Sequence, residues 1–197
     1  MFFKKIIVAL FATLTLLGCN SCGPAELESQ SNDTEVEESL VTWADCDYNV
    51  GDHPCNFELL DQNNDTFKLY DHVGKPIVLD FSTMWCGYCQ VAAQEVQAVT
   101  DAYKDYDLLY VTVLIETSTG ASPSVEDVNN WAQVFGIIDA PVLAGSRDMI
   151  DSSGIQGYPV TGWPTFVFID DEMIIKSMLR GYSSTSLDMM IQDLLTE

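Results

Sequence analysis

Two cysteines separated by two residues, Cys86 and Cys89, follow a tryptophan at the end of an apolar run, in STMWCGYCQ (residues 82–90). Such a pair can exchange electrons, bind a metal ion or stabilise a small fold as a structural disulfide. A helix is expected to begin at Cys86, and unpaired N–H groups in its first turn would stabilise a thiolate there. The pattern favours Cys86 as a nucleophile and Cys89 as the thiol that resolves a mixed disulfide. A purely structural bridge is the alternative, although so small a loop constrains the unfolded chain little.

A carboxylate interrupts the apolar run before these cysteines. Asp80 stands in PIVLDFS, six residues before Cys86, where an apolar residue is expected. Burying a carboxylate is costly or raises its pKa, so burial there needs a functional reason. The alternative is that Asp80 lies on a solvent-facing position of the strand.

The N-terminus has the order of features expected of an exported lipoprotein. Lys4 and Lys5 precede an apolar stretch, residues 6–17, which is too short to span a bilayer as a mature helix. LLGC then has the form of a bacterial lipobox, so residues 1–18 are predicted to be a signal peptide and Cys19 to carry the lipid. An ordinary cleavage site slightly downstream is the alternative. By the sorting rule known for enteric bacteria, the asparagine after Cys19 indicates the outer membrane.

An acidic, polar segment follows the signal. The chain has 8 Lys and Arg against 30 Asp and Glu, and removal of Lys4 and Lys5 takes the net charge from −22 to −24. Nucleic acids and anionic lipid headgroups would be repelled, so neither is expected as a partner. Residues 19–45 are poor in aromatic residues and are predicted to form a flexible, solvated tether, with an interaction tail as the alternative.

Two further cysteines, Cys46 and Cys55, bracket DYNVGDHP. They are the natural remaining pair once two cysteines are assigned to redox chemistry and one to lipid, so a structural disulfide is favoured. A copper site that includes His53 is the alternative, but no further residue completes a ligand set. We therefore expect neither a metal nor another cofactor.

Residues 46–197 are long and apolar enough for one domain with a real core. A short hairpin is expected around DQNND, residues 61–65, and a second around Asp170 and Asp171. Continuous apolar runs and helical patterns alternate between them, at residues 76–82, 91–103, 108–115, 124–136, 141–145 and 184–195. This order predicts an α/β fold with a central mixed sheet and helices on both faces.

Four groups of residues together resemble the thioredoxin-like redoxins, in particular the membrane-tethered thiol-disulfide oxidoreductases of the TlpA and ResA type. They are Gly51-Asp52 with Pro54 and Phe57, Gly74-Lys75-Pro76, Trp85-Cys86-x-x-Cys89, and GWPTFVFID from Gly162 onward. The resemblance covers roughly residues 50–197. It implies a thioredoxin-like fold with an N-terminal β-hairpin extension and thiol-disulfide exchange at the cysteine pair.

The resemblance also implies roles for individual residues. Asp80 matches the acid that exchanges a proton with the inner thiol, here Cys89, but the lysine that pairs with this acid in thioredoxins has no match in LLYVTVLIET. Pro164 matches the cis-proline that faces the cysteines and exposes the backbone of Trp163 to a substrate strand. The bulky Trp163 departs from the small or aliphatic residue usual there and would narrow access. The remaining residues expected to bind substrate are Trp85, Gly87 and Tyr88.

The function expected from this resemblance is reduction of protein disulfides in the cell envelope. The dipeptide in CGYC also occurs in disulfide isomerases, but the dimerisation domain that accompanies isomerase activity is missing, and tethered relatives generally reduce. We expect a monomer on a lipid anchor that faces the periplasm, with a membrane thiol transporter as one candidate electron donor. A thiol peroxidase is an alternative, since Thr83 fits it, although Leu79 stands where that family has proline. A copper-binding or chaperone module is the other alternative.

Overall fold

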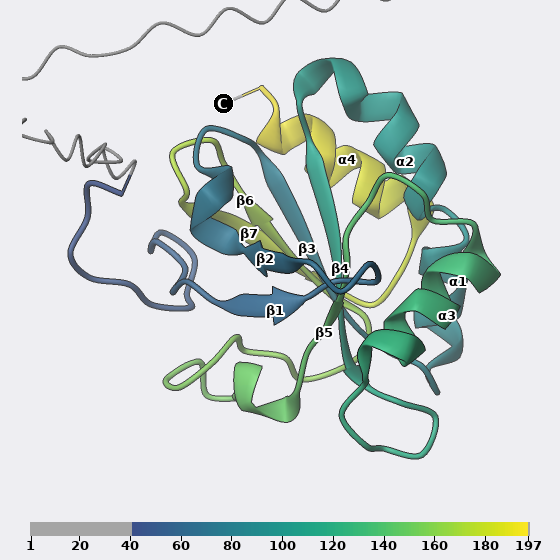
Figure 1. Ribbon diagram of the computed structural model, residues 1–197. Helices are drawn as coiled ribbons and strands as arrows, with labels where there is room; N and C mark the ends of the chain where they lie inside the picture. The colour runs from purple at the N-terminus through teal and green to yellow at the C-terminus, as the bar shows by residue number, and fades with distance from the viewer. Residues whose placement is uncertain (1–40, 197) are drawn as a thin grey trace, which may run out of the picture. The chain divides into compact units, whose positions relative to one another are not determined.

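A five-stranded mixed β-sheet forms the centre of the computed structural model, which describes residues 41–196 (Figure 1). The strand order is β5-β4-β3-β6-β7, with β3, β4 and β5 parallel and β6 and β7 antiparallel to their neighbours. The strands are β3 (Ile77–Thr83), β4 (Leu109–Glu116), β5 (Val142–Ala144), β6 (Thr165–Ile169) and β7 (Ile175–Arg180). The predicted mixed sheet is confirmed. The predicted signal peptide, Cys19 and the tether up to residue 40 lie outside the described residues.

The predicted N-terminal hairpin is also present. It pairs β1 (Glu58–Leu60) with β2 (Thr66–Lys68) in antiparallel register. The turn between them is held by the Asp61 carboxylate, which accepts hydrogen bonds from the backbone N–H groups of Asn63 and Asp65 at 2.8 and 2.9 Å. An isolated bridge from Asp61 to Leu143 joins the hairpin to β5, so the extension is part of the domain.

The helices follow the predicted order, with one difference. The α-helices are α1 (Gly87–Ala93), α2 (Val96–Tyr103), α3 (Val125–Phe135) and α4 (Ser184–Leu194); the 3-10 helices are η1 (Leu69–His72), η2 (Lys104–Tyr106) and η3 (Arg147–Met149). As predicted, α3 begins with a Ser124 cap and ends at Gly136, whose φ is 67°. The single helix predicted after Cys86 is divided into α1 and α2, because the Glu95 N–H bonds the carbonyl of Ala92, three residues back.

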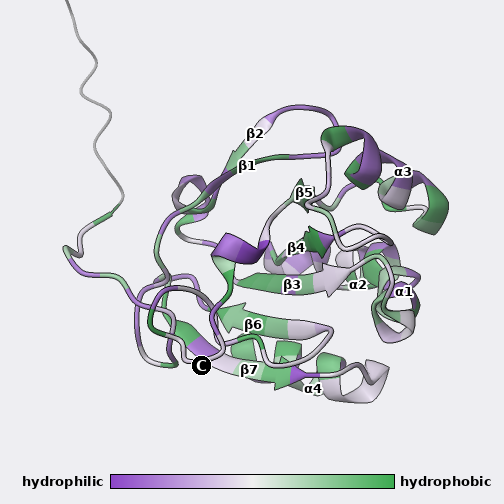
Figure 2. Cartoon of the chain, turned by 90° about the horizontal axis from the view of Figure 1, so that it is seen from below, coloured by the Kyte–Doolittle hydropathy of each residue, from purple (hydrophilic) through white to green (hydrophobic). Residues whose placement is uncertain are grey.

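The two faces of the sheet are covered differently. Alternating residues of β3, β4 and β6 pack on one face against all four α-helices, with Val78, Tyr110 and Phe166 at the centre. The other face, around Leu79 and Val113, is covered by the hairpin, η1, η3 and the segment 145–163. Its helical cover thus consists of short 3-10 helices. Figure 2 shows hydrophobic residues along β3 and β6, between these two layers.

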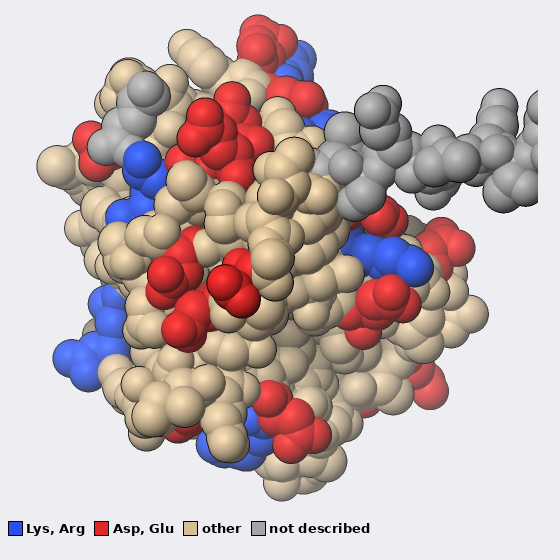
Figure 3. Space-filling view, turned by 90° about the vertical axis from the view of Figure 1, so that its left-hand side faces the viewer, with Lys and Arg blue, Asp and Glu red and all other residues tan. Residues whose placement is uncertain are grey.

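Two further properties of the fold are whether any helix could cross a membrane and how charge is distributed on the surface. Among residues 41–196, no helix combines the length and apolarity needed to cross a bilayer. On the face seen in Figure 3, several groups of Asp and Glu lie across the surface, while Lys and Arg lie mainly toward its edges. This acidity agrees with the net charge of the whole chain, −22.

Candidate active site at the start of helix α1

The sheet and the first helix together position the two free cysteines. β3 ends at Thr83, and Cys86 is the N-cap of α1, where its Sγ accepts a hydrogen bond from the Cys89 backbone N–H at 3.3 Å. Both side chains are buried thiols: Cys86 is 7% exposed and Cys89 is fully enclosed. One sulfur therefore lies close to the surface at the first turn of the helix, with the other behind it.

Burial raises the pKa of the Cys89 thiol well above its ordinary value. A hydrogen bond with the Cys86 sulfur and the nearby Asp80 charge raise it further, while hydrogen bonds from the Thr83 backbone and the Ser82 hydroxyl act in the opposite direction. Cys89 is therefore a thiol that needs a base before it can act as a nucleophile.

The Asp80 carboxyl, whose charge acts on Cys89, lies inside the fold at 1% exposure. Burial raises its pKa to about 7, although two hydrogen bonds that favour the carboxylate oppose the shift. The Ser82 hydroxyl donates to Oδ1 at 2.6 Å, and the Tyr110 hydroxyl donates to Oδ2 at 3.1 Å. Asp80 thus changes its protonation state near neutral pH, and the solvent-facing alternative is wrong.

Sequence reasoning missed Ser82 and Tyr110. The available signal for Ser82 was a second polar residue two positions after Asp80, on the same side of the strand. Tyr110 gave no comparable signal, because a tyrosine in an apolar strand is an ordinary core residue and its contact with Asp80 joins two separate strands.

A second buried carboxylate, that of Glu116, holds the tryptophan that precedes Cys86. Glu116, at the end of β4, accepts a hydrogen bond from the indole N–H of Trp85 at 2.8 Å and another from the Arg147 guanidinium. The Arg147 partner lowers the pKa of this carboxyl. Trp85 keeps about half of its surface exposed, so its ring is fixed beside Cys86 without being withdrawn from solvent. Sequence reasoning also missed Glu116 and Arg147; an acid ending an apolar strand was the signal for Glu116.

Trp163 and Pro164 reach the same region from the loop before β6. The peptide bond between them is cis, and the Trp163 ring meets the Trp85 ring edge-on at 6.5 Å between centroids. Pro164 is buried and its carbonyl accepts a hydrogen bond from the Gly181 N–H, whereas the backbone N–H and carbonyl of Trp163 have no hydrogen-bond partner among residues 41–196. Open backbone groups of this kind can pair with an extended peptide.

The helix start presents the other residues expected to bind substrate. Tyr88 is exposed over two thirds of its surface, and Gly87 has open space on the side where a Cβ would lie. Together with Trp85 they make the surface around Cys86 partly aromatic.

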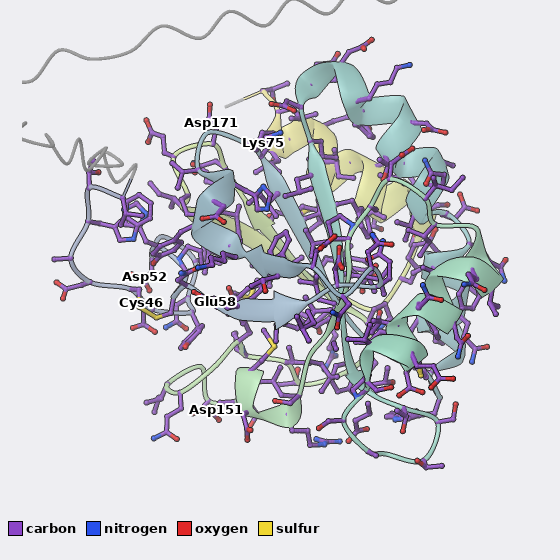
Figure 4. The ribbon with its side chains drawn as sticks, viewed as in Figure 1. Cys46, Asp52, Glu58, Lys75, Asp151 and Asp171 are labelled. Atoms are coloured by element: carbon purple, nitrogen blue, oxygen red, sulfur yellow. A yellow bond between two sulfur atoms is a disulfide. The ribbon has the colours of Figure 1, made fainter. Side chains whose placement is uncertain are left out.

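Cys46 and Cys55 lie at a different place and are bonded to each other by a disulfide. Figure 4 places Cys46 on the far side of the view from α1, close to Asp52. The nearby His53 ring stacks on Trp43 and its Nδ1 bonds the carbonyl of Met173 at 2.7 Å. In the described part of the chain, no three His, Cys, Asp or Glu side chains are grouped so that they could hold a metal ion.

The chain is similar to a known protein family and to several of its named relatives. The AhpC/TSA family matches residues 50–178. The thioredoxin-like protein YneN of Bacillus subtilis is 29% identical over 133 residues, 66% of this chain and 71% of YneN. The thiol-disulfide oxidoreductase ResA of Geobacillus kaustophilus is 26% identical over 132 residues, 67% of this chain and 70% of ResA. Among solved structures, the exposed lipoprotein thioredoxin Etrx1 of Streptococcus pneumoniae matches with a TM-score of 0.57 and 26% identity, over 71% of this chain and 98% of Etrx1.

Proposed function

The chain belongs to the AhpC/TSA family and is a thiol-disulfide oxidoreductase, and we propose that Cys86 and Cys89 are its redox pair and that it reduces protein disulfides. The observation that carries this proposal is the pairing of a near-surface thiol at a helix start with an enclosed thiol beside a buried acid. One sulfur is reachable by a partner, and the other can be reached only by the first.

The reaction then proceeds in two steps. The Cys86 thiolate attacks a substrate disulfide, forms a mixed disulfide with one half of the substrate and releases the other half as a thiolate. The Cys89 thiolate attacks the Cys86 sulfur, closes the Cys86–Cys89 disulfide and releases the second half. Two electrons pass to the substrate, and a separate thiol donor in the envelope must return them.

Asp80 accepts the proton that Cys89 loses in the second step. The carboxyl changes its protonation state at about pH 7, so it is partly ionised where the protein works. The groups that act on Cys89 are Cys86, Thr83, Ser82 and Asp80, and none of them carries a positive charge. No cation therefore stabilises the reduced form of the pair at its inner thiol, which supports the reductase direction.

The substrate is proposed to dock as an extended segment against the open backbone of Trp163, beside Pro164. Trp85, Gly87 and Tyr88 would contact the residues that flank the substrate disulfide. The bulk of Trp163 and the fixed Trp85 ring narrow this approach, which favours an exposed disulfide in a flexible segment over one enclosed in a folded core.

Location and domain organisation belong to the same proposal. We infer an exported protein in which residues 1–18 are removed, Cys19 carries a lipid, residues 19–45 form the tether and residues 46–197 form the redox domain. Etrx1 of Streptococcus pneumoniae is described as an exposed lipoprotein, which supports the same location here. Replacing Cys19 with serine should change the processed mass and release the protein from the membrane fraction. An unchanged mass in that fraction would contradict lipidation.

Insulin reduction tests the activity directly. The reduced mature protein should cleave the interchain disulfides of insulin, with turnover sustained by dithiothreitol, and Cys86→Ser should be inactive. A second arm offers hydrogen peroxide in place of insulin. Reduction of insulin without consumption of peroxide supports the proposal, whereas consumption of peroxide without reduction of insulin would assign the thiol peroxidase alternative.

A further inference from the structure

The chain contains two arginines, Arg147 and Arg180, and both lie at the redox edge, the edge of the sheet where β3 leads into α1. The parallel strands β3, β4 and β5 all end at this edge, and η3, which begins at Arg147, follows β5. Arg180 is the last residue of β7 and pairs with Thr165, which in turn pairs with Phe81 near the end of β3. Because β5 and β7 are the two outer strands, the arginines belong to opposite sides of β3 (Figure 2).

Arg147 is held beside the first tryptophan of the site. Its Nε donates to the buried Glu116 carboxylate, whose other oxygen accepts the Trp85 indole N–H at 2.8 Å. A guanidinium has five N–H donors, and the four on the terminal nitrogens of Arg147 have no hydrogen-bond partner among residues 41–196. The side chain is 64% exposed, so it can receive a second carboxylate from solvent.

Arg180 lies beside the other tryptophan of the site, Trp163. Its stem packs so closely on Gly162 that a Cβ at this glycine would lie 3.1 Å from the Arg180 Cδ. The next residue, Gly181, donates its backbone N–H to the Pro164 carbonyl at 2.8 Å, which ties the end of β7 to the loop before β6. Arg180 is exposed, and its guanidinium has no hydrogen-bond or ion-pair partner in the described part of the chain.

The lysines within residues 41–196 lie away from the redox edge. Lys75 precedes β3, Lys104 begins η2 ahead of β4, and Lys176 lies near the start of β7, all at the opposite edge of the sheet. Lys68 lies in the hairpin and pairs with Glu58. The cations at the redox edge are thus arginines, whose planar groups match a carboxylate with two parallel hydrogen bonds.

We propose that Arg147 and Arg180 are specificity-determining residues that select substrates with carboxylate side chains beside the disulfide. The inference rests on the proposed function, because the substrate strand docks against the Trp163 backbone between the two arginines. An aspartate or glutamate on one side of the substrate cysteine meets Arg180, and one on the other side meets Arg147. The preferred substrate is therefore an acidic peptide segment.

The net charge of the protein does not cancel this local attraction. The whole chain carries −22, but repulsion from distant carboxylates is screened over about 8 Å at physiological ionic strength. A substrate carboxylate that touches a guanidinium forms charge-assisted hydrogen bonds at contact distance. Acidic segments are thus repelled by most of the surface and accepted at the redox edge, which fixes where they bind.

Two synthetic peptides test this selection. Each is closed by one disulfide, and they differ only beside the cysteines, where one has glutamate and the other has glutamine. Reduced mature protein is mixed with each peptide at physiological ionic strength, and the reduced peptide is quantified by chromatography after an acid quench. Each rate is divided by the rate of the same peptide with dithiothreitol, which corrects for its intrinsic reactivity. The wild-type protein should prefer the glutamate peptide by about 2-fold to 25-fold, the scale of two exposed ion pairs.

Substitutions show whether the arginines cause the preference. Arg147→Gln and Arg180→Gln should each reduce it, and the double variant should bring the ratio of the two corrected rates close to one. Lys104→Gln is the matched control, because it removes the same charge from an exposed residue at the opposite edge and should keep the wild-type ratio. Arg180→Lys should keep only part of the preference, because an ammonium group lacks the paired donors of arginine.

A binding measurement on the wild-type protein covers variants that do not fold. The same peptides with serine in place of both cysteines cannot be reduced, and the glutamate form should inhibit insulin reduction at the lower concentration. Equal inhibition by both forms, equal corrected rates in the wild type, or a preference kept by the double variant would overturn the role of the arginines and leave the proposed function standing. Failure of the wild-type protein to reduce insulin and both peptides would overturn the proposed function itself.

Discussion

The two cysteine pairs of this domain contain the same atoms in opposite settings. Cys86 and Cys89 are buried thiols at a helix start, next to a carboxylate that changes its protonation state near neutral pH. Cys46 and Cys55, nine residues apart, form a disulfide in a loop, and Cys46 is exposed. The comparison teaches that the groups around a cysteine pair determine whether it suits redox turnover. A buried carboxyl that accepts a hydrogen bond from a serine hydroxyl lies near the first pair, whereas an aromatic stack lies beside the loop disulfide.

Trapping should show the largest difference between the pairs. Cys89→Ser should abolish turnover and accumulate mixed disulfides between Cys86 and envelope proteins, because the first step survives and the second does not. Non-reducing electrophoresis and mass spectrometry would reveal the trapped partners. Cys55→Ser is the matched control and should trap far fewer. Equal trapping by both variants would remove the distinction between the pairs.

The buried acid should make the stability of the domain depend on pH. The folded-state pKa of Asp80, about 7, lies above its ordinary value of 3.8, so its contribution to stability is complete below about pH 3.8 and is lost as pH rises through 7. Wild-type protein should therefore lose up to about 4 kcal/mol from this group, and Asp80→Asn should not. Urea unfolding of both proteins at about pH 4 and pH 8 measures the difference. A difference that stays constant with pH would contradict the buried charge.

Removing the loop disulfide should affect folding and spare catalysis. The double variant Cys46→Ser with Cys55→Ser should lower the free energy of unfolding by about 2 to 3 kcal/mol, because the unfolded chain regains the freedom of the opened loop. Denaturant unfolding measures this loss, and insulin reduction should remain near the wild-type rate. If the folded double variant lost turnover, the loop pair would be a relay for electrons.

The support around Trp85 should have the smallest effect. Glu116→Gln keeps an acceptor for the Trp85 indole but removes the charge that holds Arg147. We expect kcat/KM for insulin to fall about twofold to tenfold, mainly through KM, the scale of one hydrogen bond. Steady-state kinetics of Glu116→Gln, compared with those of Trp85→Phe, measure this fall in kcat/KM. A loss confined to kcat would place Glu116 in the chemistry instead of in docking.

Much of the fold could be predicted because each helix or strand is indicated by residues within or next to its own segment. The strand around Leu79 is a continuous apolar run since both of its faces are buried, and α3 carries its own Ser124 cap and Gly136 stop. The division between α1 and α2 could not be predicted, because it depends on a hydrogen bond to the Ala92 carbonyl in a stretch without glycine or proline.

The candidate site divides in the same way. The sequence indicated Cys86, Cys89 and Asp80 as candidate site residues, because their reactive side chains stand at a fixed spacing along a predicted strand and the helix that follows it. Ser82 and Glu116 were missed because their importance comes from their partners: the Ser82 hydroxyl bonds the buried Asp80 carboxylate, and Glu116 lies 31 residues from both Trp85 and Arg147. Such contacts exist only once the sheet is assembled.

Equilibrium with glutathione is the measurement that tests the central claim most directly. The mature protein is brought to equilibrium in mixtures of reduced and oxidised glutathione, and each cysteine pair is identified by peptide mapping after the free thiols are blocked. The Cys86–Cys89 pair should open and close reversibly at a potential near that of thioredoxin, about −270 mV, while Cys46–Cys55 stays closed throughout. A Cys86–Cys89 potential near that of DsbA, about −120 mV, or titration of Cys46–Cys55 in its place, would contradict the account.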